Sequence, residues 1–346
     1  MKKKKHTLKH LTALTVSLAV ILLALLIAGI KVGTKSTANS EEVQLYLPTG
    51  ITYNALCDTL KAHNVVNRPR LFAVYSHVRG LDKDPKSGHY ILKPHTTYIR
   101  LIQRLYTGNQ DPIRITINKQ RTLRNLCDYV ATKMEFTSDS LFRLLTSEEF
   151  LSEHNLTSKN VISLFTQNTY EVYWNMSPRR FAERMAMETD AFWTKEREKK
   201  REALNLSRAE VITLASIVDE ETLKNDEKPT IASVYLNRLR KGIKLEADPT
   251  VKYAVGDFSL RRITGVHLKV ESPYNTYRRK GLPPGPICLP GVESIDAVLD
   301  NKKTNYLYFC AKEDFSGYHN FATSLSQHYD NAKRFHKALN DRKIYN

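Results

Sequence analysis

The stretch LASIVDEETLKNDEKPTIASVYLNRL, residues 214–239, decides how the C-terminal part of this chain folds. Apolar residues recur every three or four positions on both sides of a charged break, which predicts two helices joined by a short turn. Three acids, Asp219, Glu220 and Glu221, stand where the apolar pattern of the first helix should continue. They are either a solvated helix end or the place of a functional carboxyl group.

The residues around this stretch predict where the two helices begin and end. Ser207 with Glu210 three residues later predicts a capping box, and we expect the first helix to run to about residue 223. Pro229 predicts the first turn of the second helix, and Gly242 predicts its C-cap.

A helical wheel separates the three acids. Leu214 and Val218 belong to one apolar stripe; Glu221 continues it, whereas Glu220 points to the opposite side and Asp219 lies near its edge. Burial raises a carboxyl pKa, so an inward Glu could donate and accept a proton near neutral pH. Periodicity alone still favours a frayed end with all three acids in water, although acids at a helix C-terminus oppose the macrodipole.

Composition bounds the class of protein. The chain has 346 residues, which predicts two or three units, and 41% of them are hydrophobic, which is enough to build cores. The formal net charge of +17 predicts an anionic partner: nucleic acid, an anionic membrane or an acidic polymer.

The N-terminal segment helps to choose among these partners. Residues 11–30 carry no charge and follow a lysine-rich segment, residues 1–10. Twenty such residues span the roughly 30 Å hydrocarbon layer, so we predict a retained single-pass membrane helix with residues 1–10 in the cytoplasm. A cleaved signal peptide is the alternative, but its apolar region is usually shorter and ends in a small-residue site. The predicted topology counts against nucleic acid as a partner.

The rest of the chain divides by pattern, and the predicted fold class is α+β. Residues 31–42 read as a polar linker, and residues 43–110 as a compact α+β module. Residues 111–205 form a mostly helical connecting region, in which the charge run 195–201 predicts a solvated helix face. Residues 206–346 predict a mixed α/β domain with a hairpin and a final amphipathic helix.

A loop rich in Pro and Gly, residues 272–291, lies within this last domain. It contains aromatic residues beside residues with amide and hydroxyl groups, a combination that is typical of sites that bind sugar rings. The alternative is a rigid connector with incidental polar groups. The cysteines show no zinc pattern, and one disulfide outside the cytoplasm stays open, including a pair between Cys288 and Cys310.

Four motifs together resemble the endolytic murein transglycosylase family (MltG type, YceG-like). They are LASIVDEET, VYLNRLRKGIKLEADPTVKYA, SPYNTYRRKGLPPGPICLPG and KTNYLYFCA, and their order and spacing match over residues 212–321. The predicted anchor and the module that follows it also fit that family's layout, in which the module is LysM-like.

The resemblance implies roles for five residues. The family's catalytic Glu falls on Glu221, the same residue that the helical wheel selects. Asp248, Thr250, Asn275 and Tyr277 are implied to bind the substrate, by positioning the strand or stabilising an oxocarbenium-like charge. No metal or organic cofactor is implied. Asp219 and Glu220 keep the ordinary interpretation, a solvated or marginal helix face.

The sequence also departs from the family pattern. Asn168 stands where the family has an acid, and Glu246 and Ala247 replace two polar residues of another motif. These departures put the contacts at the three positions in question.

The resemblance implies a lyase that cleaves the MurNAc–GlcNAc bond of nascent peptidoglycan strands. It would leave 1,6-anhydro-MurNAc ends, terminate glycan elongation, sit in the inner (cytoplasmic) membrane and work beside cell-wall synthases. Two alternatives stay open: a non-catalytic peptidoglycan-binding protein, and a scaffold for the synthases.

Overall fold

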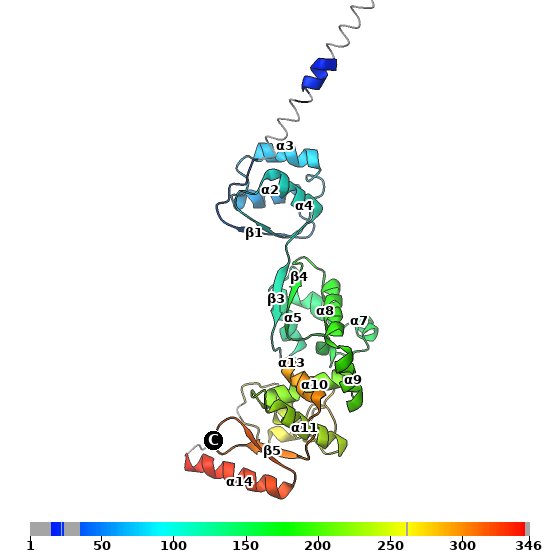
Figure 1. The fold of residues 1–346 in the computed structure, drawn as a ribbon, viewed down its shortest axis with the longest axis vertical. Coiled ribbons are helices and arrows are strands. Elements are labelled where there is room, and N and C mark those ends of the chain that lie inside the picture. Colours follow the sequence, from blue (N-terminus) through cyan, green and yellow to red (C-terminus); the bar gives the residue numbers. More distant parts are fainter. Residues whose placement is uncertain (1–14, 22, 24–34, 261, 343–346) are drawn as a thin grey trace, which may run out of the picture. The chain divides into compact units, whose positions relative to one another are not determined.

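The computed structural model describes residues 15–21, 23, 35–260 and 262–342. They fall into two compact units, one reaching Arg114 and including Glu171–Met176, the other comprising 115–170 and the described residues from Ser177 onward (Figure 1). The predicted membrane helix at 11–30 lies mostly outside the described residues. Over the part of the chain that the structure describes, no helix has the length and apolar content needed to cross a membrane.

The first unit folds around one two-stranded antiparallel sheet, in which Val43 pairs with Leu92. Side chains from both strands and from all three helices form its core, including Leu45, Phe72 and Leu101. Both strands and helices form here, as expected of an α+β module. They are β1 (Val43–Leu47), α2 (Tyr53–Ala62), α3 (Pro69–Arg79), β2 (Gly88–Leu92) and α4 (Tyr98–Thr107).

Cap residues explain where these helices begin and end. Thr52 and Thr97 each accept a backbone hydrogen bond at the start of a helix, which satisfies one of the free N–H groups there. Gly80 ends α3 with a φ of 77°, a conformation that glycine adopts at no steric cost. The assignment of this unit as LysM-like stays a prediction.

The middle of the chain alternates short helices with two paired strands, β3 and β4. Thr122, Thr137, Ser147, Ser177 and Thr194 each cap a helix by accepting a backbone hydrogen bond. The elements are β3 (Ile113–Ile117), α5 (Leu123–Ala131), α6 (Ser138–Leu145), α7 (Glu148–Glu153), the 3₁₀ helix η1 (Val161–Leu164), β4 (Asn168–Val172), α8 (Pro178–Phe192) and α9 (Lys195–Leu204).

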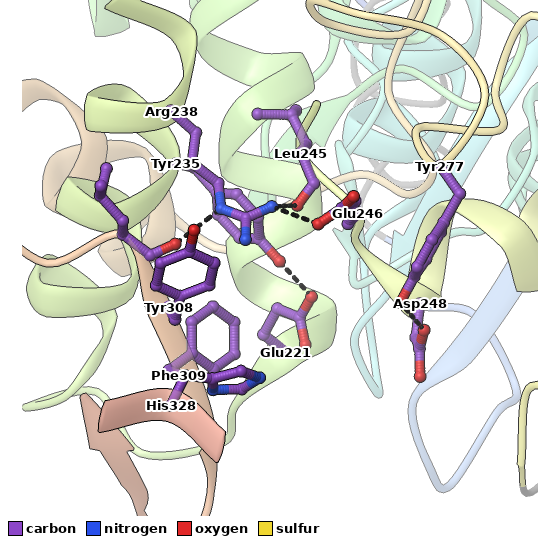
Figure 2. Close-up of a pocket in the computed structure, with 11 residues that line it drawn as sticks. Glu221, Tyr235, Arg238, Leu245, Glu246, Asp248, Tyr277, Tyr308, Phe309 and His328 are labelled. Carbon is purple, nitrogen blue, oxygen red and sulfur yellow. Dashed lines mark hydrogen bonds and ion pairs between the residues drawn. The ribbon is translucent and has the colours of Figure 1, made fainter. Parts of the chain in front are cut away.

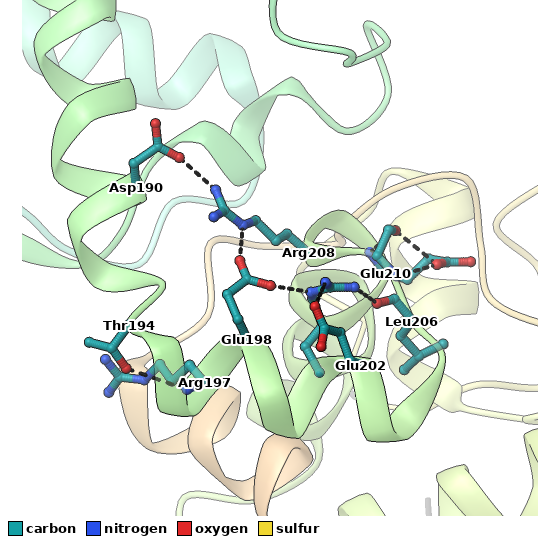
Figure 3. Close-up of polar contacts among 10 residues, drawn as sticks. Asp190, Thr194, Arg197, Glu198, Glu202, Leu206, Arg208 and Glu210 are labelled. Carbon is teal, nitrogen blue, oxygen red and sulfur yellow. Dashed lines mark hydrogen bonds and ion pairs between the residues drawn. The ribbon is translucent and has the colours of Figure 1, made fainter.

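The charge run of α9 lies at the surface, as predicted, because no residue of this helix is buried. One side of it is nevertheless ordered by ion pairs. Glu198 accepts hydrogen bonds from both Arg201 and Arg208 (Figure 3), at 2.5 Å each. Arg197 pairs with Asp296 at 2.9 Å, which ties α9 to a helix of the C-terminal region.

The C-terminal region is built around one central helix, α10, whose residues Val211–Asp219 are all buried. This differs from the single apolar stripe that the wheel predicts, because neighbouring helices cover α10 on several sides. The elements are α10 (Arg208–Glu221), α11 (Lys228–Arg240), α12 (Asp248–Val255), η2 (His267–Lys269), α13 (Val292–Asp300), β5 (Tyr308–Ala311), β6 (His319–Ala322) and α14 (Leu325–Asp341).

The fold class is α+β, with many helices and small sheets. Within the described part of residues 206–346, the β5–β6 hairpin is the only sheet, so this region is more helical than the predicted mixed α/β domain. Helix α14 packs on the hairpin (Figure 1). All four cysteines are free, so the pairing left open for Cys288 and Cys310 does not form.

Candidate active site

The helix that carries the three acids forms as its sequence predicts at its start. The Ser207 side chain accepts from the backbone of Glu210, and the Glu210 side chain accepts from the backbone of Ser207, so the capping box is confirmed. The helix ends two residues earlier than expected, at Glu221, because Thr222 is extended. Glu221 is therefore the last residue of α10.

The Glu221 carboxyl group is partly buried and meets one hydroxyl group. Tyr235, which is 2% exposed on the neighbouring helix α11, donates a hydrogen bond to its Oε1. Burial raises the pKa of Glu221 to about 7; the hydrogen bond from Tyr235 opposes this rise, and the charges of Asp248 and Glu220 add to it. Both protonation states of this carboxyl are thus accessible near neutral pH.

The other two acids correct the expectation of a solvated helix face. Asp219 is 8% exposed, and its carboxylate pairs with Lys119 at 2.8 Å and with Lys228 at 3.2 Å. Glu220 pairs with Lys119 at 2.6 Å and with Arg121 at 3.0 Å. The prediction was wrong because these cations lie outside α10, two of them about a hundred positions earlier, where helical periodicity gives no information.

This ion-pair network keeps Asp219 charged. Burial alone would raise its pKa, but Lys119 and the Ser294 hydroxyl hold the pKa of Asp219 below its usual value. The network therefore separates the acids chemically: Asp219 is a fixed anion, whereas the pKa of Glu221 is raised.

The side chain of Glu221 lines a cavity of about 350 Å³ (Figure 2). This size lies within the range of about 300–1,000 Å³ that is common for ligand pockets. The lining combines carboxylates with aromatic rings. It consists of Glu221, Tyr235, Arg238, Leu245, Glu246, Asp248, Tyr277, Leu307, Tyr308, Phe309 and His328.

Arg238 fixes one wall of this cavity. Its buried guanidinium donates to the carbonyl oxygens of Leu307, Lys244 and Leu245 at 2.6, 2.8 and 3.0 Å. The same Nη1 also pairs with Glu246 at 2.9 Å. Arg238 therefore joins α11 to two other segments through its Nε and Nη1 donors.

Two of the predicted substrate-binding residues line the cavity. Asp248 lies in the first turn of α12, and the Tyr277 hydroxyl donates to its Oδ1 at 2.7 Å (Figure 2). Burial and the neighbouring Asp248 charge raise the pKa of Tyr277, so its hydroxyl stays a donor. The pair places a negative charge and a hydroxyl in the same pocket as Glu221.

The other two predicted residues, Thr250 and Asn275, are 0% exposed and do not line the cavity. Thr250 Oγ1 hydrogen-bonds to Ala247 O at 2.6 Å and to the Thr276 hydroxyl at 2.7 Å. Asn275 Nδ2 donates to two carbonyl oxygens at 2.9 and 3.0 Å, and its Oδ1 accepts from the Tyr277 backbone at 3.0 Å. They hold the loop that carries Tyr277.

The positions that depart from the family pattern also have clear places. Asn168 is exposed on β4, where its Oδ1 accepts from the Thr169 backbone, and it does not line the cavity. Glu246 lines the cavity with a φ of 53° and binds Arg238. Ala247 is buried and donates its N–H to Thr276.

Sequence reasoning missed most of the residues that line the pocket. Tyr235 follows the apolar spacing of α11, so its hydroxyl gives no separate signal. Tyr308, Phe309 and His328 come from the hairpin and α14, whose patterns predict the elements but not which residue faces Glu221. A cap at Ser324 was the one available marker of where α14 begins.

The fold and this pocket define a class of protein, one that carries an acid–base site. Its carboxyl group has a pKa near neutral pH and lies in a cavity lined by aromatic rings and acids. A sequence model of the YceG-like family matches residues 45–334, and the chain belongs to this family.

Two similar proteins have names that state an enzymatic activity. The chain is 27% identical over 317 residues to the endolytic murein transglycosylase of Bacillus subtilis, covering 87% of this chain and 86% of that protein. It is 25% identical to the endolytic murein transglycosylase of Streptococcus pneumoniae strain D39, covering 87% of this chain and 61% of that protein. A crystal structure of a YceG-like protein from Listeria monocytogenes matches with a TM-score of 0.57 and 27% identity, covering 84% of this chain and 99% of that chain.

Proposed function

We propose that this chain is a lytic transglycosylase that cuts within peptidoglycan strands at the MurNAc–GlcNAc bond. The observation that carries the proposal is Glu221, a carboxyl group whose pKa is raised to about 7 inside a pocket. The names of the relatives support the same reaction class. A lytic transglycosylase needs one group that gives a proton and later takes one, and Glu221 suits both steps.

In the first step, protonated Glu221 gives its proton to the glycosidic oxygen. The bond between that oxygen and the anomeric carbon of the muramic residue breaks, and the leaving sugar departs with a new hydroxyl group. Positive charge develops on the ring that remains, as in other glycosidic cleavages. Glu221 is left as a carboxylate, hydrogen-bonded by Tyr235.

In the second step, the 6-hydroxyl of the same muramic residue attacks the anomeric carbon. Glu221 takes the proton of that hydroxyl, which restores the acid and closes the 1,6-anhydro ring. No water is consumed, so one carboxyl group serves where a hydrolase uses two.

The other pocket residues act on the developing charge and on the position of the strand. The Asp248 carboxylate, oriented by Tyr277, stabilises the positive charge of the ring. Tyr308 and Phe309 offer aromatic surface to sugar rings. Thr250 and Asn275 contribute indirectly, because their hydrogen bonds hold the segments that carry Asp248 and Tyr277.

We further propose that residues 11–30 anchor the chain in the inner membrane as a single pass, with the pocket outside the cytoplasm. An anchored enzyme would meet strands as membrane-bound synthases release them. Cutting such a strand internally would end its elongation. The net charge of +17 suits both strands bearing peptide carboxylates and anionic lipid headgroups.

The test of the function is digestion of purified peptidoglycan by the chain and by Glu221→Gln. We expect 1,6-anhydromuropeptides from the wild type, detected by mass spectrometry, and a rate about 10²–10⁴-fold lower for the variant. The matched control is Glu202→Gln, at an exposed glutamate of α9, which should cut at the wild-type rate.

Other outcomes would contradict the proposal and indicate a different function. Reducing ends without anhydro sugar would indicate a hydrolase. Binding of strands without cleavage by the wild type would favour a peptidoglycan-binding protein. Full complementation of a deletion strain by Glu221→Gln would favour a scaffold for the synthases.

A further inference from the structure

The pocket contains a histidine that the mechanism does not use. His328 lies in the first turns of α14, which begins after the Ser324 cap and packs on β5 and β6. Figure 2 shows its imidazole ring among the side chains that line the pocket, with Glu221 and Phe309. Because α14 follows the hairpin, the last helix supplies a polar group to a site whose acid lies on α10.

The ring of His328 is held in place by packing. It stacks on Tyr308, with ring centroids 5.4 Å apart and an angle of 22° between the planes. The guanidinium of Arg238 lies 5.0 Å from the centroid of the same tyrosine ring, and Arg238 is itself fixed by its hydrogen bonds. The orientation of the imidazole is therefore set before any ligand arrives.

One nitrogen of the ring nevertheless lacks a hydrogen-bond partner among the described residues. Nδ1 of His328 is buried, and no described residue hydrogen-bonds to it. Buried polar atoms without a partner are rare in folded proteins, so this nitrogen requires an explanation. By contrast, Glu221, Asp248 and Arg238 all have partners within the pocket.

The imidazole is also electrically neutral. Burial and the charge of Arg238 lower the pKa of His328, so the ring is uncharged at neutral pH. A neutral imidazole has one nitrogen that donates and one that accepts. Whichever tautomer is present, one ring nitrogen can therefore either donate to or accept from a ligand group that does both, as an acetamido group or a hydroxyl group does.

We propose that His328 is a substrate-binding residue that hydrogen-bonds an acetamido or hydroxyl group of the sugar held beside Glu221. This inference rests on the proposed function for the identity of the sugar polymer. Both groups can donate and accept a hydrogen bond. Chemical de-N-acetylation removes the acetamido group but leaves the hydroxyl groups, so it distinguishes the two. His328 thereby selects for the sugar substituent, while Glu221 performs the proton transfers.

The test measures binding rather than cleavage, in the full chain carrying Glu221→Gln. The probes are soluble uncrosslinked glycan strands, N-acetylated or chemically de-N-acetylated. Adding His328→Phe keeps a ring to stack on Tyr308 and removes both nitrogens, and we expect it to weaken binding of N-acetylated strands about 10- to 100-fold. The matched control is His336→Phe, at an exposed histidine of the same helix, which should leave binding unchanged.

Two further variants separate hydrogen bonding from packing. His328→Asn restores a polar group near the Nδ1 position and His328→Gln restores one near the Nε2 position; at least one should recover part of the affinity. If the acetamido group is the partner, de-N-acetylated strands bind equally with and without His328→Phe. If a hydroxyl group is the partner, the loss is the same for both kinds of strand.

Unchanged affinity in His328→Phe would overturn the inference. Equal weakening in the Phe, Asn and Gln variants, together with a lowered melting temperature in all three, would also overturn it, by assigning His328 a structural role. Failure of the proposed function gives a different result: the wild type would release no anhydro product, whatever the His328 variants do to binding.

Discussion

Asp219, Glu220 and Glu221 are consecutive acids in three different electrostatic environments. The first is a buried anion with two lysine partners, the second pairs with Lys119 and Arg121, and the third has a hydroxyl partner and a raised pKa. The difference comes from the partners, since all three belong to the same turn of α10. At this scale, a cation brought near Glu221 would lower its pKa and remove its ability to act as an acid near pH 7.

Removing the hydrogen bond to Glu221 should shift the pH profile upward. The bond from Tyr235 lowers the pKa of Glu221, so in Tyr235→Phe that pKa rises above about 7. Because the first step needs the protonated acid, the alkaline limb of kcat should move up by about one pH unit. The measurement is kcat against pH on purified glycan strands.

The control for this shift is Tyr318→Phe, whose hydroxyl binds Asp226 away from the pocket. Its profile should match the wild type, with activity declining above about pH 7. A limb that stays in place or moves to lower pH in Tyr235→Phe would contradict the assignment of Glu221 as the proton donor.

At the scale of elements, the segment after β3 supplies cations to the end of α10. Lys119 pairs with both Asp219 and Glu220, and Arg121 adds a second bond to Glu220. On the opposite side, Lys228 of α11 and the Ser294 hydroxyl of α13 reach Asp219. Three elements thus fix the residues immediately before Glu221, which orients the acid toward the pocket.

Breaking this network should destabilise the fold strongly. Lys119→Met removes one of the two cationic partners from both Asp219 and Glu220, and we expect the free energy of unfolding to fall by about 1–3 kcal/mol. The control is Arg184→Ala, which breaks an i,i+4 pair with Glu188 at the surface of α8 and should cost less than about 1 kcal/mol. Denaturant titration measures both; equal effects would show that the buried network is unimportant.

The elements were largely predictable because their signals are local. Ser207 with Glu210, and Pro229, mark helix starts by chemistry within one turn, and both mark helix starts in the structure. The predicted C-cap at Gly242 is displaced by one residue, to Lys241. The helical wheel also selected Glu221, which lines the pocket, but it left Asp219 on a solvated or marginal face, where the structure buries it.

What sequence could not supply was the set of partners distant along the chain. Lys119 reaches Asp219 across about a hundred positions, and His328 reaches the pocket from the final helix. Neither contact follows from the spacing of residues within one element. The predicted roles of Thr250 and Asn275 rested on a motif, and the structure buries both behind the residues that face the cavity.

For the whole molecule, the main expectation concerns the membrane. We expect the full chain to remain in the membrane fraction after a carbonate wash, and a chain lacking residues 1–30 to be released. A reporter at the C-terminus should be active only outside the cytoplasm, in line with the lysines before residue 11. Release of the full chain by the wash would contradict anchoring, and an active reporter inside would reverse the topology.

The pocket also has a consequence for biosynthesis. Its lining begins at Glu221 and is complete only with His328, so the walls are translated after the acid. Domains generally fold from the N-terminus as the chain leaves the ribosome. A nascent or prematurely terminated chain that stops between these residues carries the acid without His328. Such a fragment can fold its first unit yet has no pocket in which to cut.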